Sequence, residues 1–254
     1  MERKDSLNDI YKIINILSTV EKLILIISSL INIIIIFYSI KIFIILLTIL
    51  CLLYFIVYIS KEILFYYAED SRIVNCIENA FEEKIDSDVE TYLYYNNEMQ
   101  KKGNNRLAMN VFESIFTTWN IIKVRNWIEV FLYPILIVLY ILIIVIVPNQ
   151  LILVITQILF SGSFALNIYK NIFYNVSVLK IYKKMDQLFC SKRINEKESI
   201  AEQLAITFSY EKLKSYCVIL LYSKIFYKKR EELSKKWEEY KNKYLLNKKT
   251  LKQK

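Results

Sequence analysis

Hydrophobic and polar positions are separated along this chain into long blocks. Residues 23–40 form eighteen positions without a charge, and residues 42–59 form eighteen more after a single lysine at position 41. At 1.5 Å per residue, eighteen helical residues span about 27 Å, which is enough to cross the hydrocarbon core of a bilayer. One helix covering both stretches would be too long for a single crossing. The pattern therefore predicts a tight hairpin of two membrane helices that turns around residues 39–41.

A second pair of apolar stretches follows later in the chain. Residues 128–147 contain one acid, near their start, and residues 151–169 return after the sequence Pro148-Asn149-Gln150. Proline and asparagine end one helix and begin the next. The predicted fold class is all-α, with four transmembrane helices in two hairpins plus cytoplasmic helical regions. The predicted parts are an N-terminal segment (1–22), two hairpins (23–59 and 128–169), a middle segment (60–127) and a C-terminal region (170–254).

The distribution of basic residues predicts the orientation of these helices. Residues 1–22 contain four Lys or Arg, residues 60–127 contain eight and residues 170–254 contain 21, whereas the two hairpin tips contain only Lys41. Segments rich in Lys and Arg stay in the cytoplasm. Residues 1–22 also mix acids and bases, unlike a cleavable signal. We expect a multi-pass protein of the lipid bilayer with both termini in the cytoplasm.

The composition excludes most enzyme classes. The chain has no histidine and only two glycines among 254 residues, so it lacks a Ser/His/Asp triad, an HExxH zinc site and a glycine-rich phosphate loop. The four cysteines, at positions 51, 76, 190 and 217, are widely spaced, which is typical of free thiols in a reducing compartment. We expect no catalytic residue, no metal and no cofactor, and therefore a protein that is not an enzyme.

The middle segment is predicted to contain two helices, one from Asp70 and one that begins at Asn104 or Asn105 after Gly103. The linker between them combines tyrosines, amides and lysines, and includes Tyr94, Tyr95, Asn96 and Asn97. A mixture of aromatic and amide groups is suited to contact a ligand. It is equally typical of a turn whose tyrosines pack against the neighbouring helices.

The C-terminal region is strongly basic. Residues 170–254 contain 21 bases and 9 acids and carry +12, whereas residues 60–127 contain 8 bases and 11 acids and carry −3. Lysines and tyrosines alternate here and include the run Lys228, Lys229, Arg230, a mixture that suits single-stranded nucleic acid or a nucleotide. Basic helices beside a cytoplasmic leaflet are also attracted to anionic lipid, and the pattern favours lipid or solvent over a nucleotide.

Two stripes at helical spacing each leave two interpretations open. Leu233, Trp237 and Tyr240 indicate either a coiled-coil contact between subunits or a helix lying on its own domain. In the fourth apolar stretch, one face carries a polar stripe that either lines water or serves helix packing, the favoured alternative. The members of that stripe are Thr156, Ser163, Asn167 and Lys170. Four helices enclose little room for a pore, so a homo-oligomer would have to supply it.

The sequence EDSRIVNCIENAF, followed by YYNN and by NRLAMNVFESIF, resembles the membrane effectors of the Hailong nucleotidyltransferase-linked anti-phage defence system. In layout the chain is more distantly similar to the CBASS-associated four-transmembrane effector domain. The resemblance covers about 45 of 254 residues. The matching positions are Arg72, Asn79, Phe81, Tyr94, Tyr95, Asn96, Asn97, Arg106, Asn110, Phe112, Glu113 and Phe116.

The resemblance implies an oligomeric, ion-channel-like effector of the bacterial inner (cytoplasmic) membrane that acts in abortive infection. A nucleotide or oligonucleotide made by a partner nucleotidyltransferase would control it, and the released effector would depolarise the membrane. The expected ligand-binding residues are Arg72, Tyr94, Tyr95, Asn96, Asn97, Arg106, Lys228, Lys229 and Arg230. The expected pore-lining residues are Thr156, Ser163, Asn167 and Lys170.

An alternative from another class is a membrane anchor or scaffold that docks a cytoplasmic partner protein without any transport. A small transporter is disfavoured, because no charged residue lies at mid-membrane and the sequence shows no inverted repeat.

Overall fold

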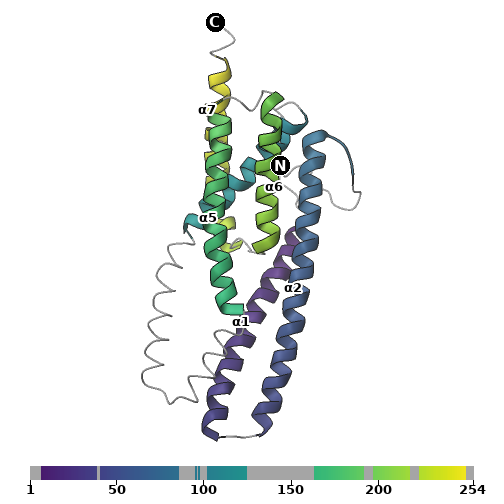
Figure 1. Ribbon diagram of the computed structural model, residues 1–254, viewed down its shortest axis with the longest axis vertical. Helices are drawn as coiled ribbons and strands as arrows, with labels where there is room; N and C mark the ends of the chain where they lie inside the picture. Colours follow the sequence, from purple (N-terminus) through teal and green to yellow (C-terminus); the bar gives the residue numbers. More distant parts are fainter. Residues whose placement is uncertain are drawn as a thin grey trace. The chain divides into compact units, whose positions relative to one another are not determined.

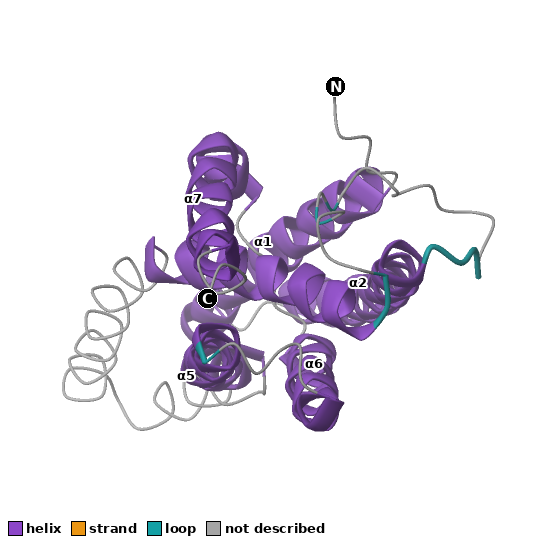
Figure 2. Cartoon of the chain, turned by 90° about the horizontal axis from the view of Figure 1, so that it is seen from above, coloured by secondary structure: helices purple, strands orange, loops and turns teal. Residues whose placement is uncertain are grey.

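The computed structural model describes residues 7–38, 41–85, 95, 97, 102–124, 163–191, 197–217 and 223–249. All regular elements within these ranges are helices, and no strand occurs among them (Figures 1 and 2). The all-α prediction is therefore confirmed for the described part of the chain. The predicted membrane stretch 128–147, and residues 151–162 of the next one, lie outside the described residues.

The helices belong to two compact units. The hairpin unit comprises Ser6–Asp70 and Ile128–Lys170, and the helical unit comprises Met1–Asp5, Ser71–Trp127 and Asn171–Lys254. In chain order the elements are α1 (Leu7–Tyr38), α2 (Lys41–Phe81), a helix over residues 104–124, α5 (Ser163–Cys190), η2 (Lys197–Ser199), α6 (Ile200–Cys217) and α7 (Ser223–Lys249). Both α2 and α5 continue from one unit into the other without a break in the helix.

Within the hairpin unit, α1 and α2 pack as an antiparallel pair. The Tyr11 hydroxyl donates to Glu69 Oε1 at 2.9 Å, and Lys61 Nζ donates to Glu21 Oε2 at 2.5 Å. The members of each pair lie almost equally far from residue 40, as expected for two helices joined by a turn there. The buried positions of α1 recur at intervals of seven and three residues, which defines one seam along the helix. They are Leu7, Ile14, Glu21, Ile24 and Ile31.

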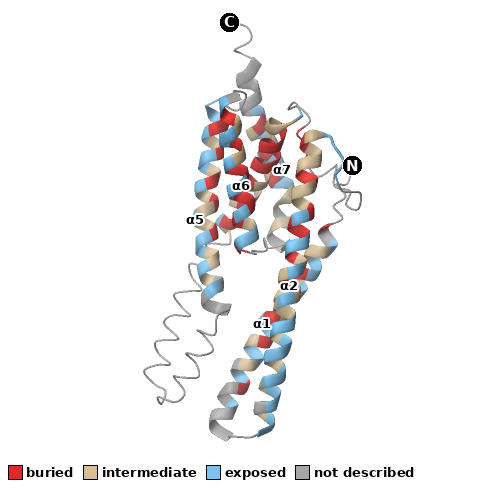
Figure 3. Cartoon of the chain, turned by 45° about the vertical axis from the view of Figure 1, so that its right-hand side comes forward, coloured by how far each residue is buried: buried red, intermediate tan, exposed pale blue. Residues whose placement is uncertain are grey.

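The outer surface of this hairpin is apolar. Within the described residues, α2 is the one helix that is long and apolar enough to cross a membrane, and none of its most apolar eighteen-residue stretch is buried. Within residues 41–59 of α2, five large apolar side chains are between 60 and 68% exposed, namely Ile42, Ile45, Leu52, Phe55 and Ile56. Figure 3 shows that this end of α2 is largely exposed. Length and composition therefore suit α2 to a membrane.

The helical unit has a conventional buried core centred on Phe112. The Phe112 side chain is fully buried, and four aromatic rings lie around it with centroid distances of 4.9 to 5.9 Å, those of Tyr182, Phe189, Trp237 and Tyr240. Aromatic pairs of this kind contribute about 0.5–1.5 kcal/mol each beyond the burial of their area. Trp237 and Tyr240 belong to α7, so the apolar stripe of this helix packs on its own unit.

Candidate functional site

A layer of buried polar side chains crosses the helical unit. It lies where the last turns of α2, the linker residues 95 and 97, the helix over 104–124 and α6 come together. Buried amides and charges are tolerated only when they are hydrogen-bonded or paired, so their positions are tightly specified. The buried polar members of this polar layer are Ser71, Asn75, Asn97, Arg106, Asn110, Thr118, Ser199, Gln203, Thr207 and Glu211. The layer also includes Arg72, Asn79 and Glu113, which are hydrogen-bonded to these residues, and Tyr95, whose hydroxyl contacts Ser114.

Three asparagines and one glutamate form a continuous chain of hydrogen bonds in this layer. Asn110 Nδ2 donates to Asn79 Oδ1 at 2.8 Å. Asn97 Nδ2 donates both to Asn110 Oδ1 and to Glu113 Oε2, each at 2.9 Å. Asn110 is fully buried and Asn97 is 1% exposed. This amide chain (Asn79, Asn110, Asn97, Glu113) joins α2, the linker residue at position 97 and the helix over 104–124.

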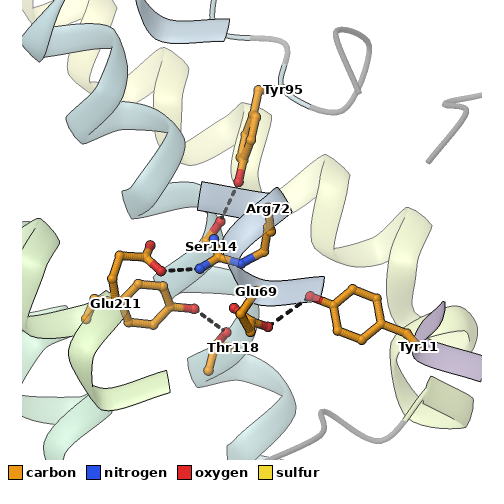
Figure 4. Close-up of polar contacts among 8 residues, drawn as sticks. Tyr11, Glu69, Arg72, Tyr95, Ser114, Thr118 and Glu211 are labelled. Atoms are coloured by element: carbon orange, nitrogen blue, oxygen red, sulfur yellow. Dashed lines mark hydrogen bonds and ion pairs between the residues drawn. The ribbon is translucent and has the colours of Figure 1, made fainter. Parts of the chain in front are cut away.

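Tyr95 is the second linker residue held in the layer. Its ring is buried in the core, and its hydroxyl lies 3.2 Å from Ser114 Oγ on the helix over 104–124 (Figure 4). At position 95, therefore, the tyrosine packs against the neighbouring helices.

Cys76 is buried in the same core. Burial raises the pKa of its thiol to about 12, with the Arg72 guanidinium and a hydrogen bond from Tyr95 acting in the opposite direction. A thiol with such a pKa stays protonated at neutral pH and is a poor nucleophile. Cys76 therefore serves as a small packing residue, in line with the free thiols expected from the spacing of the cysteines.

An ion pair joins α2 to α6. Arg72 Nη2 donates to Glu211 Oε2, and both side chains are 12% exposed (Figure 4). Next to Glu211 in α6, the Tyr210 hydroxyl lies 2.9 Å from Thr118 Oγ1. The guanidinium of Arg72 is thus already engaged by a carboxylate, and a phosphate would have to replace that carboxylate to be bound there.

Arg106 closes the end of α2. Its Nη1 donates to Glu82 Oε1 at 2.6 Å and to the Asn79 carbonyl at 3.4 Å, one of the last carbonyls of the helix. Glu82 follows α2 with a φ of 58°, a left-handed conformation that most L residues avoid. The hydrogen bond and charge of Arg106 lower the pKa of the Glu82 carboxyl. Gly103, with a φ of 110°, donates to the Ala80 carbonyl at 2.8 Å and precedes the helix that begins at residue 104.

The structure brings together four of the predicted ligand-binding residues, Arg72, Tyr95, Asn97 and Arg106, in the polar layer. Tyr94 and Asn96 lie outside the described residues. The remaining three lie on α7, and in the described part of the chain no hydrogen bond or ion pair connects them to the polar layer. These are Lys228, which is exposed, and the half-buried Lys229 and Arg230.

The predicted pore-lining residues are less fully described. Thr156 lies outside the described residues, and Ser163 and Asn167 belong to α5 although their side chains are not described. Lys170 is half-buried on α5. The choice between a pore lining and helix packing stays a prediction.

Sequence reasoning missed the contribution of α6. Ser199 at the end of η2 and Gln203, Thr207 and Glu211 of α6 recur every fourth residue and are all buried. Gln203 Nε2 donates to Ser199 Oγ at 3.0 Å and to Asn105 Oδ1 at 3.3 Å. The four-residue repeat of polar residues was the available signal, since residues at this spacing share one face of a helix.

Among the described residues, no group of three or more Cys, Asp or Glu side chains is arranged to hold a metal ion. Comparisons with protein-family models, with curated proteins and with solved structures found no match for the chain.

Proposed function

We propose that this protein is an ion-channel-like membrane effector of bacterial anti-phage defence. In this proposal four helices cross the inner membrane, copies of the chain assemble around a pore, and the helical unit lies in the cytoplasm. A nucleotide or oligonucleotide made by a partner nucleotidyltransferase binds the polar layer and controls the pore. Release of the pore depolarises the membrane and ends the infection together with the cell.

The observation that supports this proposal best is the continuity of α2. This helix has 41 residues and, at 1.5 Å per residue, is about 62 Å long. It carries the exposed apolar face of the hairpin unit at one end and Arg72 and Asn79 of the polar layer at the other. A rearrangement of the polar layer would act on the membrane part through the same helix.

The two arginines give the ligand a way to act. Arg72 pairs with Glu211 and Arg106 pairs with Glu82. An anionic ligand whose phosphates form bidentate, charge-assisted hydrogen bonds would compete with these carboxylates for the guanidinium groups. The ligand would then shift the population toward the arrangement in which the ion pairs are open.

The test is a measurement of membrane potential in cells loaded with a potential-sensitive dye. We expect expression of the wild-type chain to depolarise the cells when its regulator is absent or displaced. In cells that express the Arg72→Ala, Arg106→Ala double variant, the membrane potential should no longer respond to the regulator. The Lys212→Ala, Lys236→Ala double variant, which removes two exposed cations outside the polar layer, is the matched control.

Reporter fusions after Lys41 and after Lys254 test the topology, and periplasmic activity of the second fusion would contradict it. An unchanged potential in every condition would contradict the pore. It would instead favour the membrane anchor. The pairing of Arg72 with Glu211 and of Arg106 with Glu82 supports this alternative, because both arginines then stabilise the helical unit and need no ligand. The anchor should retain a cytoplasmic partner protein on purified membranes without altering the potential.

A further inference from the structure

The exposed apolar faces of α2 and α5 continue beyond the stretches that hydropathy assigns to the membrane. The second predicted membrane stretch ends at residue 59, yet Ile63, Tyr66 and Tyr67 of α2 are also exposed. The fourth ends at residue 169, yet α5 exposes three further apolar residues, Ile172, Phe173 and Val176. On each helix the extension is about two turns.

The charge that ends the second stretch does not lie on the exposed face. Lys61 is directed into the hairpin, where it pairs with Glu21 at 2.5 Å, and the two side chains are 11% and 6% exposed. The Tyr54 hydroxyl donates to the same carboxylate at 3.3 Å, and Lys61 Nζ lies 4.9 Å from the centre of the Tyr58 ring. Lys61 is therefore withdrawn from the outer face of α2, and the charged residue beside it, Glu62, is half-buried and hydrogen-bonded with Tyr58. Past these two residues the outer face of α2 exposes Ile63, Tyr66 and Tyr67.

On α5 the exposed face changes from apolar to basic. Beyond Val176, the next exposed positions on the following turns include Lys180, Lys183 and Lys184. At the level of this change the Phe173 ring contacts the exposed Tyr216 ring of α6, with centroids 5.9 Å apart and planes at 74°. Aliphatic and aromatic side chains followed by lysines is the order found from the hydrocarbon core to the headgroup phosphates of a bilayer.

We infer that the outer faces of α2 and α5 contact lipid as far as Tyr67 and Val176, and that Lys180, Lys183 and Lys184 bind the phosphates of anionic headgroups. From Ile42 to Tyr67, α2 has 26 residues. At 1.5 Å per residue these span about 39 Å, close to the roughly 40–45 Å of a bilayer with its headgroup regions. The inference rests on the membrane location in the proposed function, and it requires neither a pore nor a ligand.

Thiol accessibility tests the depth of α5. Cys51 and Cys190 are the exposed native cysteines and would be replaced by Ala and Ser, whereas Cys76 and Cys217 are buried. Val176→Cys, Leu52→Cys or Phe208→Cys would then be introduced singly, and the full chain would be reconstituted in phosphatidylglycerol vesicles and treated with a membrane-impermeant maleimide. The three side chains are 65%, 62% and 67% exposed, so exposure within the protein is matched.

We expect the cysteine at position 176 to react about tenfold or more slowly than the one at position 208, because the maleimide needs a water-accessible thiolate. It should be as protected as the cysteine at position 52, and all three should react alike in dodecyl sulfate. Fast labelling at position 176 with protection at position 52 would overturn the inference and leave the membrane location intact. Fast labelling at all three positions would overturn the membrane location itself.

Spin-labelled lipids test the lysines. We expect the motionally restricted lipid around the wild-type chain to be enriched in phosphatidylglycerol over phosphatidylcholine. The Lys180→Gln, Lys183→Gln, Lys184→Gln variant should bring that ratio close to one, since it removes the attraction of these three charges to an anionic surface. A control variant that removes three exposed lysines elsewhere, at positions 212, 235 and 236, should keep the enrichment. No enrichment for the wild type, or equal loss in both variants, would refute the headgroup site.

Discussion

The ion pair between Arg72 and Glu211 allows the energetic role of the polar layer to be measured. In an Arg72→Ala variant, the Glu211 carboxylate would keep its buried position, with a side chain only 12% exposed, and lose the guanidinium that contacts it. Removing one partner of a buried pair costs about 3–5 kcal/mol, because the remaining charge stays desolvated. Both groups retain some contact with solvent, so we expect the lower value, about 3 kcal/mol. For a chain of this size that corresponds to a fall in Tm of about 6–12 °C.

The double variant Arg72→Met, Glu211→Leu separates the ion pair from the packing of its side chains. Replacing both charges with apolar groups of similar volume leaves no uncompensated charge, so the Tm should return close to the wild-type value. Each melting curve would be followed with a fluorogenic maleimide in the background that lacks the two exposed cysteines. The signal then comes from Cys76 and Cys217, which are buried in the helical unit and become reactive only when it unfolds.

Two results would refute this reasoning. One is an Arg72→Ala variant that melts within about 2 °C of the wild type, since that shift corresponds to at most about 1 kcal/mol. The other is a double variant that melts as low as the single one, which would mean that side-chain packing and not charge pairing is lost.

The remaining predictions concern four other residues of the helical unit. Asn110→Leu removes the hydrogen bonds that Asn110 makes with Asn97 and with Asn79; the loss of such bonds in a buried site costs about 1–3 kcal/mol each, so the Tm should fall by several degrees, and an unchanged Tm would contradict the amide chain. Trp237→Ala removes a buried ring from the aromatic core and should cost about 3–5 kcal/mol in the same assay. Cys76 has a folded pKa of about 12 against an ordinary 9.0, so its contribution to stability is complete below pH 9 and should be lost as the pH rises toward 12; rapid alkylation of the folded protein at pH 8 would argue against this. Glu82 has a lowered pKa, so its contribution is present above its ordinary pKa of 4.5 and should be lost as the pH falls further, a dependence that Glu82→Gln should weaken.

The secondary structure could largely be predicted because its signals are local. Lys41, which separates the two uncharged stretches, is the first residue of α2, and Gly103, whose φ is 110°, directly precedes the helix over 104–124. The stripe of α7 was also visible, but periodicity tells which face is buried and not what covers it. Its partner turned out to be the core around Phe112 in the same unit.

The polar layer could not be predicted because it depends on contacts between distant segments. Arg72 and Glu211 are separated by 139 positions in the chain, and an isolated acid in a basic region gives no indication of its partner. The sequence around Asn97 has the composition of a surface turn, yet Asn97 is buried and bonded to the helix that follows it. A polar stripe such as that of α6 is the same in sequence whether it faces water or other amides.

Glu113 sets the direction of the amide chain. An asparagine side chain can present either its oxygen or its NH₂ group to a neighbour, whereas an ionised carboxylate can only accept. Glu113 therefore requires the NH₂ group of Asn97, that same group faces the Asn110 oxygen, and Asn110 then has its NH₂ group left for Asn79. The carboxylate at one end of the chain therefore determines, for each asparagine, which neighbour its NH₂ group faces and which neighbour its oxygen faces. The Asn97 side chain consequently binds with its amide in one orientation. A protonated Glu113 could also donate a hydrogen bond and would no longer impose that orientation.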